Sequence, residues 1–556
     1  MKGNIKNIVL LVTCVCAVGV GIGSIFIFGF NNGNLLPDVP SNNPGTSHVL
    51  IDDGSGMQTE YQESNRTNRA AFTYLDVNES AHSPITPSTG DVNILVVPVN
   101  FDLNDIRPYE RRSYIDFNED NYLEAMEYTF NGVSSLDGAN PYWESVSSFY
   151  EKSSYGNLHF NFEISDPFTP QMSASEFLSK EDLTSSSSSV GGSQALITDI
   201  LEHCLTKNDV PIDIFDAKYD QNKDGYIDGM WLIYNVIDGD LVSSESQPFW
   251  AYTTNYLAKA TDTETGEIKI VGTRYANCAL SFLYDDSPSS GYDAHTIIHE
   301  TGHMLGLDDY YSYDNSGNYG YLGGIDMMDL NIGDHSAFSK YALGWIEPTV
   351  IYQDDTTITL KPFESSGDAL IIPSSYYNDS AFSEYLILEY ETPTGLNELD
   401  ATKKYRNAYP LAFSNGLAIY HVDARLIKHE IQNGYYTCSD YLSESESTVP
   451  EVEVHGSRED VYLVGNSNTP SYNGISDDYA LVRLISKERT LYSENPKTSR
   501  VGSTRRDLYQ AGDSFGTDQV DMFFSHNTFN NGTPINNVSI KVTAMNDEGI
   551  TLHISR

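Results

Sequence analysis

The sequence predicts an α+β protein in which a first domain of mixed helices and strands is followed by an all-β, sandwich-like domain. Its 556 residues are too many for one hydrophobic core, and the 40% of apolar residues suffices for two or more. Between residues 91 and 350, apolar residues recur with strand spacing in some segments and helix spacing in others. Residues 351–556 contain short alternating runs between turn-rich spacers, a pattern typical of β-sandwiches. We therefore expect one domain at residues 91–350 and a second at residues 351–556.

The N-terminal part of the chain predicts export. Positive residues precede residues 8–30, an uncharged and mostly apolar run. As a helix this run would span about 34 Å, against about 30 Å of hydrocarbon in a bilayer. We assign residues 1–30 as a signal or membrane anchor that places the rest of the chain outside the cell. An uncleaved anchor is slightly favoured, although residues 17–19 offer a small-residue cleavage site. Residues 31–90, rich in Asn, Ser, Pro and Thr, are expected to be a stalk or a short pro-segment.

The strongly acidic composition excludes one class of partner. The chain has 78 acidic and 32 basic residues, for a formal net charge of −46. Nucleic acid binding needs clustered Lys and Arg, so we expect no nucleic acid partner. Outside residues 8–30 the cysteines are Cys204, Cys278 and Cys438, which allow one disulfide at most and exclude a disulfide scaffold.

The first domain begins with a strand, a helix and a second strand. Residues 92–101 have the length and β-branching of a buried strand. Apolar residues at helical spacing over residues 142–150 precede a turn and an alternating run from Leu158. Residues 184–192 contain successive serines and predict a surface loop, after which Ser193 is expected to cap an amphipathic helix.

Residues 220–228 predict a calcium loop. Oxygen-bearing side chains alternate along this segment, and Gly225 stands where such a loop turns sharply. The twelfth position holds Trp231, within an apolar run, in place of the bidentate acid of an EF-hand. The loop is therefore expected to lead into a strand, with an acidic surface turn as the alternative to a metal site. The expected calcium ligands are Asp220, Asn222, Asp224 and Asp228.

Residues 299–309 predict a zinc site on a helix. His299 and His303 are four residues apart, so a helix presents both rings on one face and lets them share one metal ion. Glu300 then lies beside the first ligand, where its carboxylate can reach a zinc-bound water. Gly306 can adopt the left-handed conformation that ends a helix, which brings Asp309 to the metal as a third ligand.

This extended pattern resembles that of the metzincin proteases, with an aspartate in place of their more usual third histidine. The resemblance implies a methionine turn beneath the metal. A glycine-rich turn with methionines lies at residues 323–329, and Met328 is our candidate for the floor of the site. Ordinary core packing is the alternative role for these methionines.

Two neighbouring residues bear on the ligand assignment. Asp308 competes with Asp309, and we favour Asp309 because it completes the three-residue step after the glycine that the extended pattern requires. His295 falls on the same helix face as the histidine pair, but about 12 Å would separate it from His303. We expect His295 to be a first-turn residue at the surface or a residue that supports a ligand.

The remaining segments complete the two domains. Residues 334–345 predict a capped helix, after which Pro348 closes the first domain. His421 and Asp423 fall on one side of a strand and are expected to be structural. The expected strands of the second domain include residues 357–360, 385–390, 417–422, 462–464 and 550–554.

Together these segments resemble the immune-inhibitor-A-type secreted metalloproteases, a bacterial branch of the metzincins. The resemblance covers about residues 90–556. Its carriers are residues 150–156, the calcium-like loop, residues 299–311, 324–345, 386–390 and 416–423. It implies a secreted zinc endopeptidase that acts on proteins or peptides, often made with a pro-segment. The chain departs from the family through its short pre-catalytic segment and its apparent anchor.

We therefore expect an extracellular zinc endopeptidase in which Glu300 activates a zinc-bound water. One rival is a thermolysin-like site with a glutamate from a later helix as third ligand, which the glycine step disfavours. The other is a calcium-dependent surface adhesion protein with an inactive protease-like domain, which the intact Glu300 disfavours. Tyr310, Tyr311 and Tyr321 are candidates to stabilise the oxyanion, and spacing does not choose among them.

Overall fold

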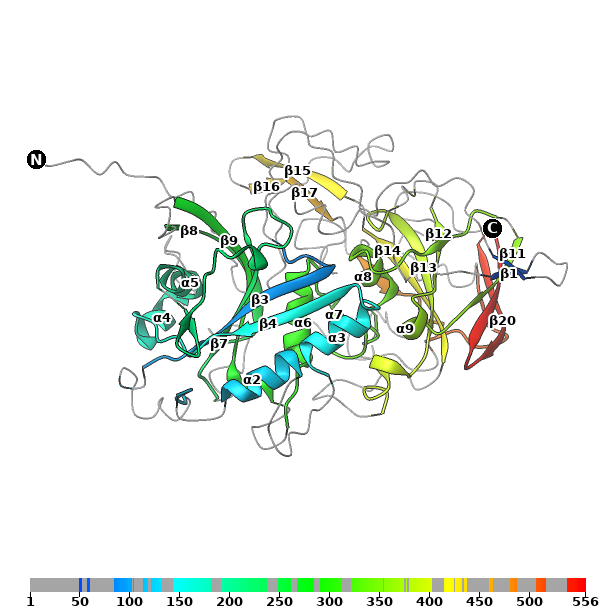
Figure 1. Ribbon diagram of the computed structural model, residues 1–556. Coiled ribbons are helices and arrows are strands. Elements are labelled where there is room, and N and C mark those ends of the chain that lie inside the picture. Colours follow the sequence, from blue (N-terminus) through cyan, green and yellow to red (C-terminus); the bar gives the residue numbers. More distant parts are fainter. Residues whose placement is uncertain are drawn as a thin grey trace, which may run out of the picture.

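The computed structural model (Figure 1) describes about three fifths of the chain. The described residues are 50–52, 58–60, 85–102, 104, 114–118, 122–132, 144–181, 192–203, 205–237, 249–261, 268–284, 291–311, 322–353, 355–374, 377, 380–402, 415–424, 426–432, 435–437, 460–463, 481–487, 507–516 and 538–556. The mixed α/β architecture has several sheets and few helices.

A five-stranded sheet forms the centre of the first half, in the order β4-β3-β7-β9-β8. Its strands are β3 Gly90–Val99, β4 Leu158–Ile164, β7 Ile227–Tyr234, β8 Tyr252–Thr261 and β9 Ile268–Ala279. β3 pairs in parallel with β4 and β7, and β7 pairs in parallel with β9. Only β8, at one edge, runs antiparallel to its neighbour. All residues of β7 are buried, as expected for a central parallel strand covered on both faces.

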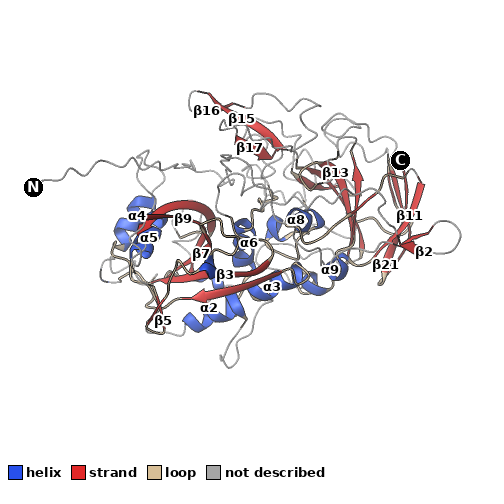
Figure 2. Cartoon of the chain, turned by 45° about the horizontal axis from the view of Figure 1, so that its top comes forward, coloured by secondary structure: helices blue, strands red, loops and turns tan. Residues whose placement is uncertain are grey.

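Helices pack around this sheet. The helices before the predicted zinc motif are α2 Tyr122–Asn131, α3 Val146–Ser153, α4 Ala174–Glu181 and α5 Gly192–Glu202. α2 and α3 contact β4, whereas α5 contacts β8. α6 His295–Met304 contacts β8 and β9 and lies near the middle of the molecule (Figure 2). It is followed by α7 Met327–Leu330, α8 Ala337–Ala342 and α9 Phe363–Ser366. Short 3-10 helices are η3 Ala217–Tyr219, η5 Leu280–Leu283 and η6 Gly395–Asn397.

Two further sheets make up most of the second half. One has the order β10-β12-β13-β14-β18, with β10 Thr349–Val350, β12 Ala369–Pro373, β13 Glu384–Glu391, β14 Gly416–Asp423 and β18 Val482–Leu484. The other has the order β19-β20-β21-β11-β1-β2, with β1 Leu50–Asp52, β2 Gln58–Glu60, β11 Asp355–Leu360, β19 Ser514–Phe515, β20 Ser539–Asn546 and β21 Gly549–Ser555. Small sheets pair β5 Thr206–Lys207 with β6 Val210–Pro211, and β15 Leu426–Gln432 with β16 Tyr435–Thr437 and β17 Asp460–Leu463.

The sheet that contains β13 has a hydrophobic core on each face. Tyr385 and Ile387 join the core shared with the first half of the chain, whereas Leu386 and Leu388 join a second core, shared with residues of β11, β20 and β21. This alternation follows from the two-residue period of a strand. The sheet thus lies between the helices around α8 and the six-stranded sheet.

Some segments differ from the sequence-based expectations. β1 and β2 lie within residues 31–90, where we expected a stalk or pro-segment, and β1 pairs with β11 of the C-terminal sheet. Ser193 lies inside α5 rather than at its N-cap, and its hydroxyl instead contacts the hydroxyls of Tyr252 and Tyr275 at 2.8 and 2.9 Å. A sequence pattern cannot foresee these partners, since both tyrosines lie far along the chain.

Other expectations lie outside the described residues. These are the apolar run at residues 8–30, the serine loop apart from Gly192, Tyr321, Cys204 and Cys438. Within the part of the chain that the structure describes, no helix is both long and apolar enough to cross a membrane. Cys278 is buried and not in a disulfide.

Candidate active site

α6 carries the two histidines and is buried along its whole length. Tyr150, from α3, donates a hydrogen bond from its hydroxyl to the backbone oxygen of Ile298 at 2.7 Å. Thr86, just before β3, donates its backbone N–H to the carbonyl of Met304 at 3.1 Å. Both contacts tie the helix to the sheet side of the molecule, which fixes the direction in which its side chains point.

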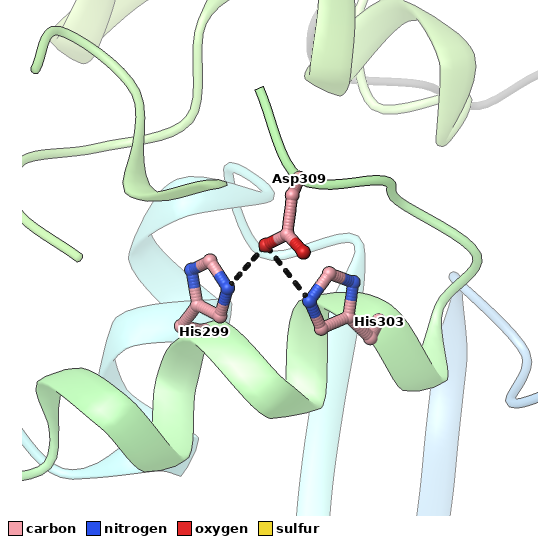
Figure 3. A group of neighbouring side chains, drawn as sticks. All are labelled: His299, His303 and Asp309. Carbon is pink, nitrogen blue, oxygen red and sulfur yellow. Dashed lines mark hydrogen bonds and ion pairs between the residues drawn. The ribbon is translucent and has the colours of Figure 1, made fainter. Parts of the chain in front are cut away.

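His299, His303 and Asp309 converge on one point (Figure 3). Asp309 Oδ1 lies 2.8 Å from His299 Nε2 and 3.2 Å from His303 Nε2. His299 Nδ1 lies 2.9 Å from the carbonyl oxygen of Met327, and His303 Nδ1 lies 2.7 Å from that of Leu307. Because a carbonyl only accepts, each Nδ1 carries a hydrogen, which leaves Nε2 of both rings to face the shared point.

The backbone reverses at Gly306, whose φ of +100° lies in the region that favours glycine. Its N–H donates to the carbonyl of His303 at 3.0 Å, and the N–H of Leu307 donates to that of Gly302 at 3.1 Å. The turn carries the chain back over the helix, so that Asp309 meets the histidine pair from outside α6. A β-branched or bulky residue at position 306 would strain this reversal.

The donor atoms fit a zinc ion. Zinc binds imidazole nitrogen and carboxylate oxygen at about 2.0–2.2 Å, which places tetrahedral donors about 3.3 Å apart. The separations between Nε2 and Oδ1 are close to this value, and the three donor atoms all lie within 4.8 Å of one another. Three protein ligands leave a fourth position open, as in catalytic zinc sites. Within the described residues, no other group of three or more His, Cys, Asp or Glu side chains is close enough to hold a metal ion.

Asp308 does not join this cluster. Its carboxylate is buried, and neither oxygen has a hydrogen-bond partner among the described residues. Burial raises the pKa of Asp308 to about 7, although the positive charges of His303 and Arg274 oppose the rise. For Asp309 the balance is reversed: despite burial, His303 and His299 hold its pKa well below the usual range. The geometry therefore favours Asp309 as the third donor.

Glu300 lies next to the first histidine on α6 and is 7% exposed. Burial raises the pKa of its carboxyl, against the lowering effect of His303 and His299. A carboxylate with a raised pKa takes up a proton more readily, which suits a general base near neutral pH. Thr253, on β8, places its hydroxyl oxygen 3.0 Å from Glu300 Oε2.

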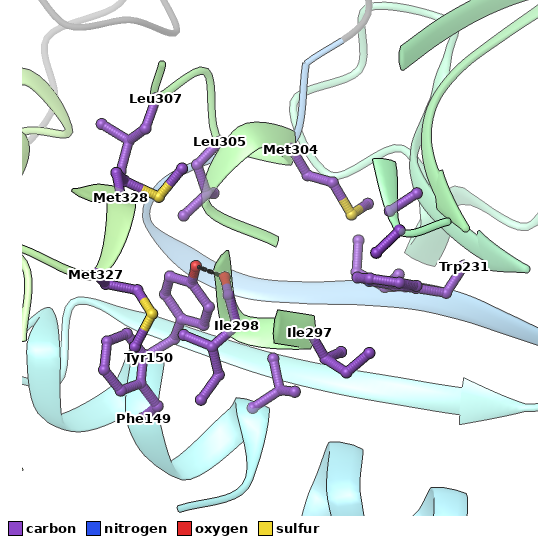
Figure 4. Close-up of a cluster of buried hydrophobic side chains, with 14 of the residues drawn as sticks. Phe149, Tyr150, Trp231, Ile297, Ile298, Met304, Leu305, Leu307, Met327 and Met328 are labelled. Carbon is purple, nitrogen blue, oxygen red and sulfur yellow. Dashed lines mark hydrogen bonds between the residues drawn. The ribbon is translucent and has the colours of Figure 1, made fainter. Parts of the chain in front are cut away.

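The segment predicted to form a methionine turn packs against α6. It includes the first residues of α7, which begins after Asp326, and the side chain of Asp326 accepts a hydrogen bond from the backbone N–H of Met328 at 2.7 Å. Figure 4 shows Met327 and Met328 on one side of α6 and Met304 toward Trp231. A Cβ atom on Gly302 would lie 2.5 Å from the Met328 sulfur. Gly302 therefore permits a close approach between the helix and this side chain.

His295 does not lie at the surface as one of our expectations had it. Its side chain is fully buried, with Nδ1 2.6 Å from Asp293 Oδ1 and Nε2 3.2 Å from Asp400 Oδ2. Asp400 also accepts the backbone N–H of Gly333 at 2.8 Å. This contact could not be predicted from the sequence, because Asp400 follows His295 by more than one hundred residues and belongs to no motif. An aspartate two residues before a helix histidine was the one local signal.

In the predicted calcium loop, aspartate side chains accept hydrogen bonds from the loop's own backbone. The N–H groups of Gln221 and Gly225 donate to Asp228 Oδ2 and Asp220 Oδ2 at 2.9 and 3.1 Å. The other carboxylate oxygen of each aspartate is buried without a hydrogen-bond partner in the described part of the chain. Burial, together with Asp220 and Asp224, raises the pKa of Asp228 to about 8, against the hydrogen bond from Gln221. The loop leads into β7, a strand, as expected.

The candidate tyrosines differ in where they point. Tyr310 is fully buried and its hydroxyl lies 2.9 Å from the hydroxyl of Ser339, so it serves packing. The ring of Tyr311 stacks on His299 with 6.4 Å between ring centroids. In the second half, His421 Nε2 lies 2.9 Å from Glu384 Oε1 on the adjacent strand, which agrees with a structural role.

Comparison with known proteins supplies one match. Residues 87–329 match a family model described as immune inhibitor A peptidase M6, catalytic domain. The matched segment runs from just before β3 to α7 and contains the three converging donor residues. A comparison with curated proteins finds no match.

Proposed function

Because residues 87–329 match the model of the immune inhibitor A peptidase M6 catalytic domain, we propose that the protein is a zinc-dependent endopeptidase of protein substrates. The observation that carries the proposal is the convergence of His299, His303 and Asp309 beside Glu300. The rival hypothesis, a surface adhesion protein with an inactive protease-like domain, gives no reason for a buried carboxylate to be kept beside that cluster.

The side chains that would bind the metal are preorganised for it. Both histidines are held in the Nδ1–H form by backbone carbonyls, so neither ring must reorient to offer Nε2. Asp309 is ionised and supplies a negative charge that offsets part of the charge of a divalent cation. When bound, zinc supplies a Lewis acid that lowers the pKa of water and favours negative charge on a carbonyl oxygen.

Glu300 carries the proton transfers. Its carboxylate is positioned to accept a proton from the attacking water and then to return that proton to the leaving amine. Burial raises the pKa of Glu300 and so makes its carboxylate a stronger base for the first of these steps. No sequence preference follows from these residues.

The test is digestion of an unbiased peptide mixture by the purified protein, with and without a zinc chelator. We expect cleavage that the chelator abolishes and added zinc restores. Glu300→Ala is the matched control, and it should retain zinc, measured by elemental analysis, while losing cleavage. A zinc-loaded protein that cleaves no peptide, or a variant as active as the wild type, would contradict the proposal.

We further propose that residues 220–228 bind calcium through Asp220, Asn222, Asp224 and Asp228, although the three carboxylates are not gathered around one point in this structure and would have to draw together on the ion. Support comes from the buried, unpartnered Oδ1 atoms of Asp220 and Asp228, since buried carboxylate oxygens are otherwise costly. Calcium added to the metal-stripped protein should raise its thermal unfolding midpoint, and Asp228→Ala should remove that response. Equal midpoints with and without calcium would count against the site.

We also propose that the protein acts outside the cytoplasm. This rests on the apolar run at residues 8–30, which predicts export. Fractionation of the producing cell tests it: the protein should be found outside the cytoplasmic membrane or bound to its outer face, and recovery in the cytoplasm would contradict the proposal.

A further inference from the structure

A hydroxyl group on the edge strand of the first sheet contacts the carboxylate beside the metal ligands. Thr253 lies on β8, where it pairs with Ala276 of β9. Its Oγ1 lies 3.0 Å from Glu300 Oε2 and 2.8 Å from the backbone oxygen of the same residue. Thr253 is 8% exposed, so this contact is shielded from most of the solvent.

The geometry restricts how the Glu300 carboxylate can turn. Among the described residues, Thr253 is the one side chain for which a hydrogen bond to that carboxylate is resolved. A threonine hydroxyl has one hydrogen to donate, and it can point it either to the carboxylate or to the backbone carbonyl of Glu300. Donation to Oε2 holds that oxygen on the β8 side, which leaves Oε1 to exchange the proton with water.

The hydroxyl also links β8 to α6, two elements whose separation sets the position of the Glu300 carboxylate. β8 is an edge strand, whereas Glu300 is on α6, and the two oxygen atoms of Glu300 that Thr253 contacts belong to the backbone and the side chain of one residue. The position of the carboxylate is therefore held relative to both its own helix and the sheet. A general base that acts over one hydrogen-bond length benefits from such fixed placement.

We propose that Thr253 is a positioning residue that orients the Glu300 carboxylate for proton transfer. The inference rests on the proposed peptidase function. It predicts an effect on the turnover step, with little effect on substrate affinity, because Thr253 acts through Glu300.

The test compares three variants on a fluorogenic peptide that the wild-type protein cleaves. Thr253→Val keeps the shape of the side chain and removes the hydroxyl, whereas Thr253→Ser keeps the hydroxyl. Thr254→Val is the matched control, because the next residue of a strand points to the opposite face. Thr254 is half-buried, and no hydrogen bond of its hydroxyl is resolved.

We expect Thr253→Val to lower kcat by about tenfold to one hundredfold, the effect of losing a hydrogen bond to a charged group, with KM within about twofold. Thr253→Ser should restore at least half of the decrease in log kcat. Thr254→Val should have the kcat of the wild type. Zinc content and the thermal unfolding midpoint should be unchanged in all three, which separates orientation from loss of the metal or of the fold.

Failure of the positioning role and failure of the proposed function give different results. An active wild type with an equally active Thr253→Val variant overturns the positioning role alone. A zinc-loaded wild type that cleaves no peptide overturns the proposed function and the inference with it. Should Thr253→Val unfold at a much lower temperature, Thr253→Ser and Thr253→Ala carry the test, and equal kcat for these two overturns the inference.

Discussion

Asp400→Asn removes one of two carboxylates that hold the buried His295 at the start of α6. The imidazole lies between Asp293 and Asp400, with its Nδ1 2.6 Å from the first and its Nε2 3.2 Å from the second. Asparagine preserves the size of the side chain and still offers an oxygen to the N–H of Gly333. The substitution therefore removes mainly charge.

The magnitude follows from the pKa of His295. Burial alone would lower this pKa, but the charges of Asp293 and Asp400 and their hydrogen bonds raise it to about 9. A rise from the ordinary value of 6.5 corresponds to about 3 kcal/mol of stability, present in full below about pH 6.5 and lost as the pH rises through 9. Because Asp293 remains, we expect the variant to lose only part of this, about 1–2 kcal/mol, at pH 6.

The assay is urea unfolding of the metal-free protein at pH 6, 7.5 and 9.5, so that metal binding adds no pH dependence of its own. The urea midpoint of Asp400→Asn should lie below that of the wild type at pH 6, and the gap should narrow toward pH 9.5. Glu398→Gln removes the same charge at an exposed position two residues away and serves as the control. A gap that stays constant with pH would refute the assignment of a protonated His295.

Other predictions concern the ligands, the helix and a buried lysine. Asp309→Ala should lose zinc, measured by elemental analysis, whereas Asp308→Ala should keep most of it; the reverse result would exchange their roles. Gly302→Ala should lower the free energy of unfolding by about 1–3 kcal/mol in urea titrations, because the new methyl group would displace a methionine sulfur 2.5 Å away. Lys340→Ala should cost about 3–5 kcal/mol in the same titration, because Asp334, 2.6 Å from the fully buried amine, would remain as an unpaired charge. A loss below about 1 kcal/mol would mean that Asp334 takes up a proton or reaches water.

The sequence predicted the local parts of this architecture well. Segments with a clear period, such as the strand before Phe101 and the run after Gly225, became β3 and β7 because neighbouring residues decide whether a segment suits a strand. Gly306 was also predictable, since a single backbone conformation can return Asp309 to its helix. In each case the determining residues lie within about ten positions of one another.

Contacts between distant segments could not be predicted. Thr253 precedes Glu300 by 47 positions, and Asp400 follows His295 by 105, with no periodicity that relates them. A threonine on an edge strand and an aspartate after a strand are common residues in common places. Their importance appears only when the strand order places them beside α6, because hydrogen bonds depend on distance in space and not along the chain.

The same distant contacts bear on how the two halves of the chain cooperate. The secondary structure changes at about residue 350, yet buried hydrogen bonds join the two sides of this boundary. Glu389 Oε2 accepts the backbone N–H of Ala337 at the start of α8, and Asn397 Oδ1 accepts the backbone N–H of Asp334. The shared hydrophobic core also crosses it, through residues of β13 and β14. Removal of the second half would expose apolar side chains, leave these N–H groups without partners in the protein, and take away Asp400, one of the two carboxylates that contact His295. The segments around α6 therefore depend on β13 and the residues that follow it, and the first half of the chain should lose stability when these are removed.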